Sequence, residues 1–157
     1  MMIKLVHMDE QAFQFFVGQA TRDYAVDKIN TGAWDPEIAM KLSEEAITRS
    51  LPKGLRTDGV YLYSIVEISS DEQVGYIWFN VSEGRSGREA FIYDCYIFEP
   101  FQRKGYGKQA MIALDEEARE MNVTRIGLNV FGQNNRAFEL YKKMGYAVTD
   151  ITMSKEL

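Results

Sequence analysis

The sequence has few of the residues on which metal, thiol or disulfide chemistry depends. Its 157 residues include one cysteine, Cys95, and one histidine, His7. A single cysteine excludes an internal disulfide framework, and neither residue belongs to a cluster with the spacing of a structural zinc site. One histidine close to the N-terminus leaves almost no room for a Ser-His-Asp or Cys-His arrangement. If the protein is an enzyme, we expect it to use neither a metal nor thiol–histidine chemistry.

Positive charge and long apolar runs are also scarce. The 18 Lys and Arg residues are outnumbered by 23 Asp and Glu residues, which gives a net charge of −5. This balance argues against bulk binding to nucleic acid and weakly favours a cationic or neutral partner. No apolar run reaches the roughly 20 residues of a membrane span, and no signal-peptide pattern follows the first residue. We therefore expect a cytoplasmic protein, with one domain over residues 1–157, that binds neither nucleic acid nor a membrane.

The apolar residues change period along the chain. Asp9 can cap a long first helix, and the Asp35-Pro36 pair is a start signal for a second. From Asp58 the apolar residues follow a period of two, and the polar turns between these runs are short enough to favour antiparallel neighbours. The later part of the chain returns to helical spacing, and Gly145 suits the position that ends its last helix.

These patterns together predict one mixed α/β sheet with helices on both faces. Strands are expected over residues 2–8, 60–68, 74–81, 90–98, 125–131 and 146–153. Helices are expected after the two start signals, up to about residue 122, and over residues 134–144. Because helices separate the later strands, the second half of the sheet should be parallel, whereas the first half should be antiparallel.

Residues 94–108 (DCYIFEPFQRKGYGK) run from a strand through a glycine-bearing turn into a helix. The first N–H groups of a helix lack internal partners and lie at the positive end of its dipole, so an anion binds there readily. Arg103, Lys104 and Lys108 concentrate positive charge in an otherwise acidic chain. The segment therefore indicates an anion site, although a plain glycine turn with solvated basic residues fits the glycines equally well.

Two anion-binding templates fit this segment poorly. A Walker P-loop needs Ser or Thr after its lysine, but Gln109 follows Lys108, and no glycine stands five residues before Gly107. Residues 105–110 do spell the G-x-G-x-x-A pattern of a dinucleotide fold. However, these glycines lie six or more residues beyond the strand, and the next strand ends without an acid for a ribose hydroxyl.

A third template fits two segments at once. Residues 102–107 (QRKGYG) resemble the Q/R-x-x-G-x-G/A motif of the GNAT superfamily of N-acetyltransferases, whose loop holds the pyrophosphate of acetyl-coenzyme A. Residues 134–146 (NNRAFELYKKMGY) are similar to the N-x-x-A-x-x-L-Y-x-x-x-G-F/Y signature of the same superfamily. The expected order of strands and helices also matches over nearly the whole chain. The resemblance implies antiparallel N-terminal strands joined to a parallel pair that splays around acetyl-CoA.

The resemblance also implies roles for residues of the loop and of the strand before it. Ile97 and Phe98 would pair with the pantetheine arm through their main chains, and Gln102 would brace the turn. Main-chain N–H groups would bind the pyrophosphate from Arg103, Lys104, Gly105, Tyr106, Gly107 and Lys108. The sequence departs from the common pattern at Arg103, where many members have glycine; this position is variable in the superfamily.

In the second segment, the resemblance implies that Asn134 approaches the pantetheine or a nearby backbone group. Ala137 would keep the helix slim enough for the cofactor to pass, and Tyr141 would lie near the thioester sulfur. A tyrosine with an ordinary pKa near 10 is protonated at neutral pH, so Tyr141 can donate a proton to the departing thiolate. Tyr141 also lies on the apolar stripe of its expected helix, where it could serve for packing alone.

The attacking amine needs a base, because an alkyl amine with a pKa near 10 is almost wholly protonated at neutral pH. Asp94 is one candidate, since a carboxylate within an apolar strand requires a reason. Glu67, Glu99 and an ordered water are the alternatives. Cys95 is expected to be inert, because an apolar strand surrounds it and no histidine is near it in sequence.

The resemblance implies direct transfer of an acetyl group from acetyl-CoA to a primary amine in a ternary complex, with Tyr141 as general acid. The acceptor would be an amine on a small molecule, peptide or protein. A non-catalytic acyl-CoA sensor on the same fold is the alternative, and Tyr141 favours the enzyme. The sequence does not identify the acceptor, and the last expected strand could pair across a homodimer axis.

Overall fold

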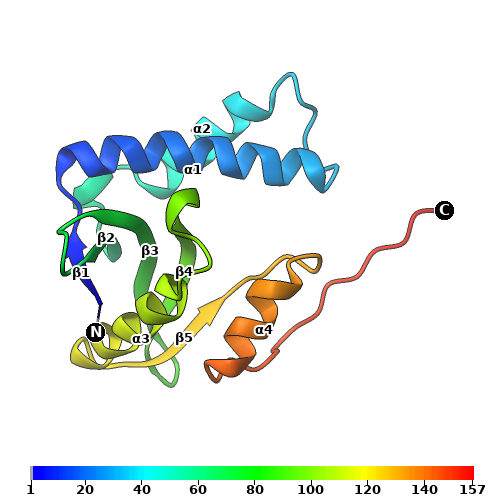
Figure 1. Ribbon diagram of the computed structural model, residues 1–157. Coiled ribbons are helices and arrows are strands. Elements are labelled where there is room, and N and C mark those ends of the chain that lie inside the picture. Colours follow the sequence, from blue (N-terminus) through cyan, green and yellow to red (C-terminus); the bar gives the residue numbers. More distant parts are fainter. Residues whose placement is uncertain (1) are drawn as a thin grey trace.

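The computed structural model describes residues 2–157, which build one five-stranded sheet in the order β1-β2-β3-β4-β5 (Figure 1). The strands are β1 (Ile3–His7), β2 (Val60–Glu67), β3 (Gln73–Gly84), β4 (Gly87–Ile97) and β5 (Val123–Leu128). The first four strands are antiparallel neighbours, and β5 runs parallel to β4. The expected mixed sheet is confirmed, because a helical crossover separates only the last pair.

Helices cover both faces of this sheet (Figure 1). They are α1 (Glu10–Asn30), α2 (Ala39–Ser50), α3 (Tyr106–Glu120) and α4 (Asn135–Lys143), with short 3-10 turns η1 (Gly54–Arg56) and η2 (Glu99–Phe101). The Asp9 cap is confirmed, since its carboxylate accepts a hydrogen bond of 2.8 Å from the Ala12 N–H. The second helix begins later than expected, because the Asp35 carboxylate accepts from the Glu37 N–H at 2.8 Å and closes a turn before α2. Among residues 2–157, no helix is long and apolar enough to span a bilayer.

Two apolar clusters fill the spaces on either side of the sheet. One lies between the sheet and α3, and includes Ile65, Phe79 and Leu114. The other lies under α1 and α2, where the Phe16 ring stands edge-on to Tyr76 and Trp78, with ring centroids 4.9 and 5.8 Å apart. Phe16 is therefore the point at which α1 rests on β3.

A bulge in β4 changes which face its side chains occupy. Phe79 of β3 pairs with Ile92, but the neighbouring Trp78 pairs with Asp94, so Tyr93 is an extra residue in β4. Ile92 lies in the cluster on the α3 side. Without the bulge Asp94 would lie on that side too, because residues two apart share a face. The bulge instead turns Asp94 toward α1, as bulges beside active sites often do.

The parallel pair opens at the same point. Pairing between β4 and β5 extends only from Arg88↔Val123 to Ile92↔Leu128, whereas β4 stays paired with β3 as far as Ile97. One edge of β4 is therefore unpaired beyond its bulge. This is the splay that the GNAT resemblance implies.

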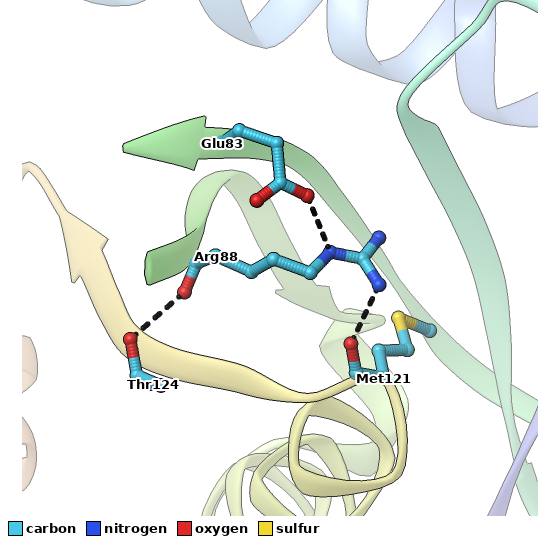
Figure 2. Close-up of polar contacts among 4 residues, drawn as sticks. All are labelled: Glu83, Arg88, Met121 and Thr124. Atoms are coloured by element: carbon cyan, nitrogen blue, oxygen red, sulfur yellow. Dashed lines mark hydrogen bonds and ion pairs between the residues drawn. The ribbon is translucent and has the colours of Figure 1, made fainter. Parts of the chain in front are cut away.

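Arg88 holds the opposite, closed end of this pair (Figure 2). Its guanidinium donates to the Met121 carbonyl oxygen at 2.7 Å and lies 3.1 Å from a carboxylate oxygen of Glu83. Its own carbonyl oxygen accepts from the Thr124 hydroxyl at 3.1 Å. These contacts join the β3–β4 hairpin to Met121, just before β5, and to Thr124 at the start of β5, so the two parallel strands stay together at one end while they separate at the other.

The expected last strand over residues 146–153 is wrong. After Gly145, which ends α4 with a φ of 98°, the chain joins no sheet and runs away from the body of the protein (Figure 1). Val148, Ile151 and Met153 are 54, 74 and 86 % exposed. Apolar and β-branched residues favour an extended chain, but a strand also needs a neighbour, and the chain leaves α4 without returning to the outer edge of β5.

Candidate active site

Six consecutive N–H groups, from Arg103 to Lys108, hydrogen bond to no other group among residues 2–157. The first N–H of α3 that is bonded belongs to Gln109, which donates to the Gly105 carbonyl oxygen at 3.2 Å. No side chain caps this helix. Orphan donors at the positive end of a helix dipole form an anion site, and here the row is longer than the four that a helix leaves by itself.

The loop conformation explains why these donors gather. Arg103 and Gly105 both have positive φ, 64° and 86°, and alternation of right- and left-handed backbone turns successive N–H groups toward one concave side. The Gln102 side-chain amide donates to the Ile97 carbonyl oxygen at 2.8 Å and ties the loop to the end of β4. The side chains of Arg103, Lys104 and Lys108 are exposed beside the donors. The arrangement therefore fits a phosphate-bearing group.

The open edge of β4 presents only some of its main chain. The Phe98 N–H donates to Val74 and the Phe98 carbonyl oxygen accepts from Phe101, at 2.9 and 2.8 Å. Both main-chain groups of Phe98 therefore already have a partner within the protein. Because alternate residues of a strand point to opposite neighbours, Ile97 turns its N–H toward the open edge, while Gln102 occupies its carbonyl oxygen.

The Tyr106 side chain is buried in the core on the α3 side, so only its main chain lies at the loop. Its hydroxyl donates to the Glu67 carboxylate, and this hydrogen bond lowers the pKa of Glu67. A carboxylate held in its ionised form by a donor is a weaker base. Glu99, the other carboxylate considered for the base, is exposed within η2.

Asp94 differs from both of these carboxylates. It is half-buried on the α1 side of β4. Its pKa is raised from 3.8 to about 7, chiefly by burial and then by the Asp23 and Asp27 carboxylates of α1, against the opposing effects of the Tyr76 hydroxyl and the Cys95 N–H. A pKa near the working pH is the property that a general base needs.

Tyr141 of α4 packs partly buried against the core on the α3 side. Its pKa is raised to about 12, chiefly by burial and then by the nearby Cys95 and Asp94 of β4. Its phenol therefore stays protonated at any ordinary pH. The pKa of the Cys95 thiol is also raised to about 12, chiefly by burial, so Cys95 supplies almost no thiolate at neutral pH.

The second signature segment shapes the start of α4. The Asn134 side-chain oxygen accepts from the Ala137 N–H at 3.3 Å, so Asn134 caps the helix. Ala137 itself is half-buried.

Three residues at this site were missed by sequence reasoning: Asp23, Asp27 and Tyr76. Tyr76 is fully buried. The sequence does place the two acids on the same side of α1 as Phe16. Their closeness to Asp94, however, depends on the β4 bulge, which turns Asp94 toward α1.

A sheet that opens between two parallel strands, with an anion-binding helix start and a titratable carboxyl group beside the opening, is typical of a group-transfer enzyme with a phosphate-bearing donor. Residues 25–146 match the model of the acetyltransferase (GNAT) family, and the chain belongs to that family.

Its relatives in Bacillus subtilis (strain 168) include "Uncharacterized N-acetyltransferase YycN", which is 39% identical, and "Uncharacterized N-acetyltransferase YdgE", which is 36% identical. Each match spans 100% of this chain, and 100% and 99% of the two relatives. The crystal structure of YycN superposes with a TM-score of 0.93, covering 99% of this chain and 98% of that one. A GNAT family acetyltransferase from Staphylococcus aureus shares the fold, with a TM-score of 0.61 at 18% identity and full coverage of both chains.

Proposed function

We propose that this acetyltransferase moves the acetyl group of acetyl-CoA directly to a primary amine in a ternary complex. The observation that carries the proposal is the row of six orphan N–H groups from Arg103 to Lys108, beside the unpaired edge of β4. The row fits a pyrophosphate, and the Ile97 N–H fits a pantetheine amide. Acetyl-CoA, bound there as co-substrate, supplies the activated thioester carbonyl.

The two titratable groups then divide the proton transfers between them. As the amine nitrogen forms a bond to the carbonyl carbon, the carbon–sulfur bond breaks and its electron pair leaves with the sulfur. Asp94 accepts the proton that the amine loses, directly or through one water. Tyr141 donates a hydrogen bond and a proton to the departing thiolate, and its phenol is recovered from solvent. The products are an amide and free CoA thiol.

A thiol-release assay tests this function. Purified protein with acetyl-CoA should release thiol only when an amine is added, in proportion to amide formed. Mass spectrometry of the products checks the stoichiometry. Tight acetyl-CoA binding without turnover across a broad set of small amines and amine-bearing peptides would contradict the proposal and favour an acyl-CoA sensor. Because the proposed donor is an intracellular metabolite, we also propose a cytoplasmic location.

We further propose a homodimer formed by exchange of the segment 147–157. Each chain carries both an extended segment with exposed apolar side chains and an unpaired outer edge on β5. A two-fold exchange would pair both features at once and leave no open edge at β5. Light scattering should find a dimer that dissociates in the double variant Ile151→Asp, Met153→Asp. A monomeric wild-type protein at high concentration, or a dimer indifferent to the double variant, would contradict the exchange.

A further inference from the structure

Two carboxylates of α1 lie in line with the residue that rests on the sheet. Asp23 and Asp27 follow Phe16 by seven and eleven residues, so all three point within about 20° of one direction on the helix. At the helical rise, Asp23 lies about 10 Å and Asp27 about 16 Å beyond Phe16. Figure 1 shows the second half of α1 extending past β4, on the side of the sheet where β5 and α4 lie. The two acids therefore overhang the open edge of β4.

Within the described chain, residues 2–157, no cation forms an ion pair with these acids. Among residues 2–157, ion pairs join only Lys4 with Asp71 and Arg88 with Glu83.

The polar neighbours along α1 are engaged with other groups. The Gln19 amide donates to both oxygens of Asp23 at 3.1 Å, and Arg22 donates to the Gln19 oxygen at 3.4 Å. The Lys28 ammonium lies over two aromatic rings at 5.6 Å from each centroid. Like charges one helical turn apart destabilise a helix unless something offsets them. Burial and the nearby Asp23 raise the pKa of Asp27, as expected for uncompensated acids.

A buried hydroxyl group gives a second, independent indication of a missing ligand. The Tyr76 side chain is fully buried, yet its hydroxyl makes no hydrogen bond of normal geometry within the described chain. It lies on the α1 side of β3, where Tyr76 pairs with Tyr96 and the next pair on that face is Trp78 with Asp94. The pKa of Tyr76 is raised chiefly by burial, and then by the charges of the nearby Asp94 and Asp23 carboxylates. An orphan buried hydroxyl is destabilising, and a bound donor or acceptor would relieve that cost.

We propose, resting on the acetyl transfer proposed above, that the acceptor carries two cationic groups, as an alkyl diamine or polyamine does. The reacting amine lies at Asp94 and Tyr76, and the second ammonium group lies at Asp23 and Asp27. An ammonium group has three donors, which suits two carboxylates one helical turn apart. The transfer step remains the one already given: one amine nitrogen gains the acetyl group and loses a proton, while the distal ammonium group is unchanged.

The double variant Asp23→Asn, Asp27→Asn tests this assignment. Asparagine keeps the size of each side chain and removes only the charge, and relief of the repulsion should leave the fold intact. The matched control is Glu116→Gln, Glu120→Gln on α3, which removes two exposed carboxylates also one turn apart. The substrates are 1,4-diaminobutane and 1,5-diaminopentane, each compared with the monoamine of equal chain length.

For the wild-type protein we expect kcat/KM for the diamines to exceed that for the monoamines by about tenfold or more, which is about 1.4 kcal/mol of added binding. In the Asp23/Asp27 variant the ratio of kcat/KM for diamines to kcat/KM for monoamines should fall to about one, because a change in the pKa of Asp94 alters both values alike. The control pair should retain the preference, which separates a local contact from a change in net charge.

The possible failures can be told apart. Equal kcat/KM for diamines and monoamines in the wild-type protein, or equal losses for both in the variant, overturns the second cation site and leaves acetyl transfer intact. Turnover of peptide amines but of no diamine also overturns the site alone. An absence of amine-dependent thiol release with every acceptor overturns the proposed function and the acceptor assignment together.

Discussion

Replacement of Asp94 by asparagine changes both activity and stability, and each change depends on pH in a known direction. The pKa of Asp94 is raised from 3.8 to about 7, mainly by burial. Below pH 4 the carboxyl group is protonated in both the folded and the unfolded chain. Between about pH 4 and 7 the unfolded chain releases the proton while the folded protein keeps it. The contribution of Asp94 to the unfolding free energy of the wild-type protein must therefore fall as pH rises through this window, and level off above it.

The magnitude follows from the size of the change in pKa. A rise of about three pH units corresponds to about 4 kcal/mol, and about 2 kcal/mol remains if water reaches part of the carboxyl group. Asparagine has no such proton to lose. We therefore expect the Asp94→Asn variant to gain about 2–4 kcal/mol over the wild-type protein between pH 4 and 8.

Urea unfolding at several pH values, followed by circular dichroism, measures the stability difference. Glu99→Gln serves as control, because this carboxylate is exposed and near in sequence. A difference between Asp94→Asn and wild type that is constant from pH 4 to 8 would refute the burial argument. In the same variant, kcat/KM should fall about 10²- to 10⁴-fold and lose its acidic limb near pH 7. If the limb persists, another group is the base.

Three further changes probe the donor site and its support. Tyr141→Phe should lower kcat by about 10²-fold with little change in KM for acetyl-CoA in the thiol-release assay, because only the proton donor is removed; unchanged turnover would exclude Tyr141 from the step. Gly105→Ala should lower the stability by about 1 kcal/mol, or about 2–4 °C in Tm, since φ is 86° at this position. The control Gly107→Ala, inside α3 without positive φ, should be neutral or stabilising. Equal losses in the two melting curves would argue against backbone strain as the cause. Arg88→Ala should lower the unfolding free energy in urea by about 1–3 kcal/mol, because the Met121 carbonyl oxygen loses its donor, and should leave KM for acetyl-CoA unaffected. The control Arg85→Ala, at an exposed residue, should change stability little. Equal effects of the two variants would mean that the contacts in Figure 2 contribute no stability.

Elements with local causes were predictable from the sequence. The Asp9 cap, the glycine loop before α3 and the Gly145 end of α4 all depend on residues within a few positions of one another. The antiparallel order of β2 to β4 followed from short turns, which leave no room for a crossover. Where local signals compete, the prediction was less accurate, as at Asp35, whose carboxylate closes a turn instead of starting the helix.

Features that depend on distant partners were not predictable in this way. The expected strand over residues 146–153 has the composition of a strand but no neighbour in the chain. Phe98 lies at the predicted place, yet Val74 and Phe101 already occupy its main chain. Strand pairing and main-chain availability are decided by the whole sheet, which local sequence patterns do not encode.

The sequence by itself therefore determined the family resemblance, the anion-binding helix start and the candidate acid and base, because each depends on residue types at fixed short spacings. Only the tertiary structure decided what surrounds them. The extra residue at Tyr93 turns Asp94 to the α1 side, where burial and two carboxylates of α1 raise its pKa. Burial and charge–charge interactions act through space between α1 and β4, segments more than 50 residues apart, so no pattern along the chain could specify them.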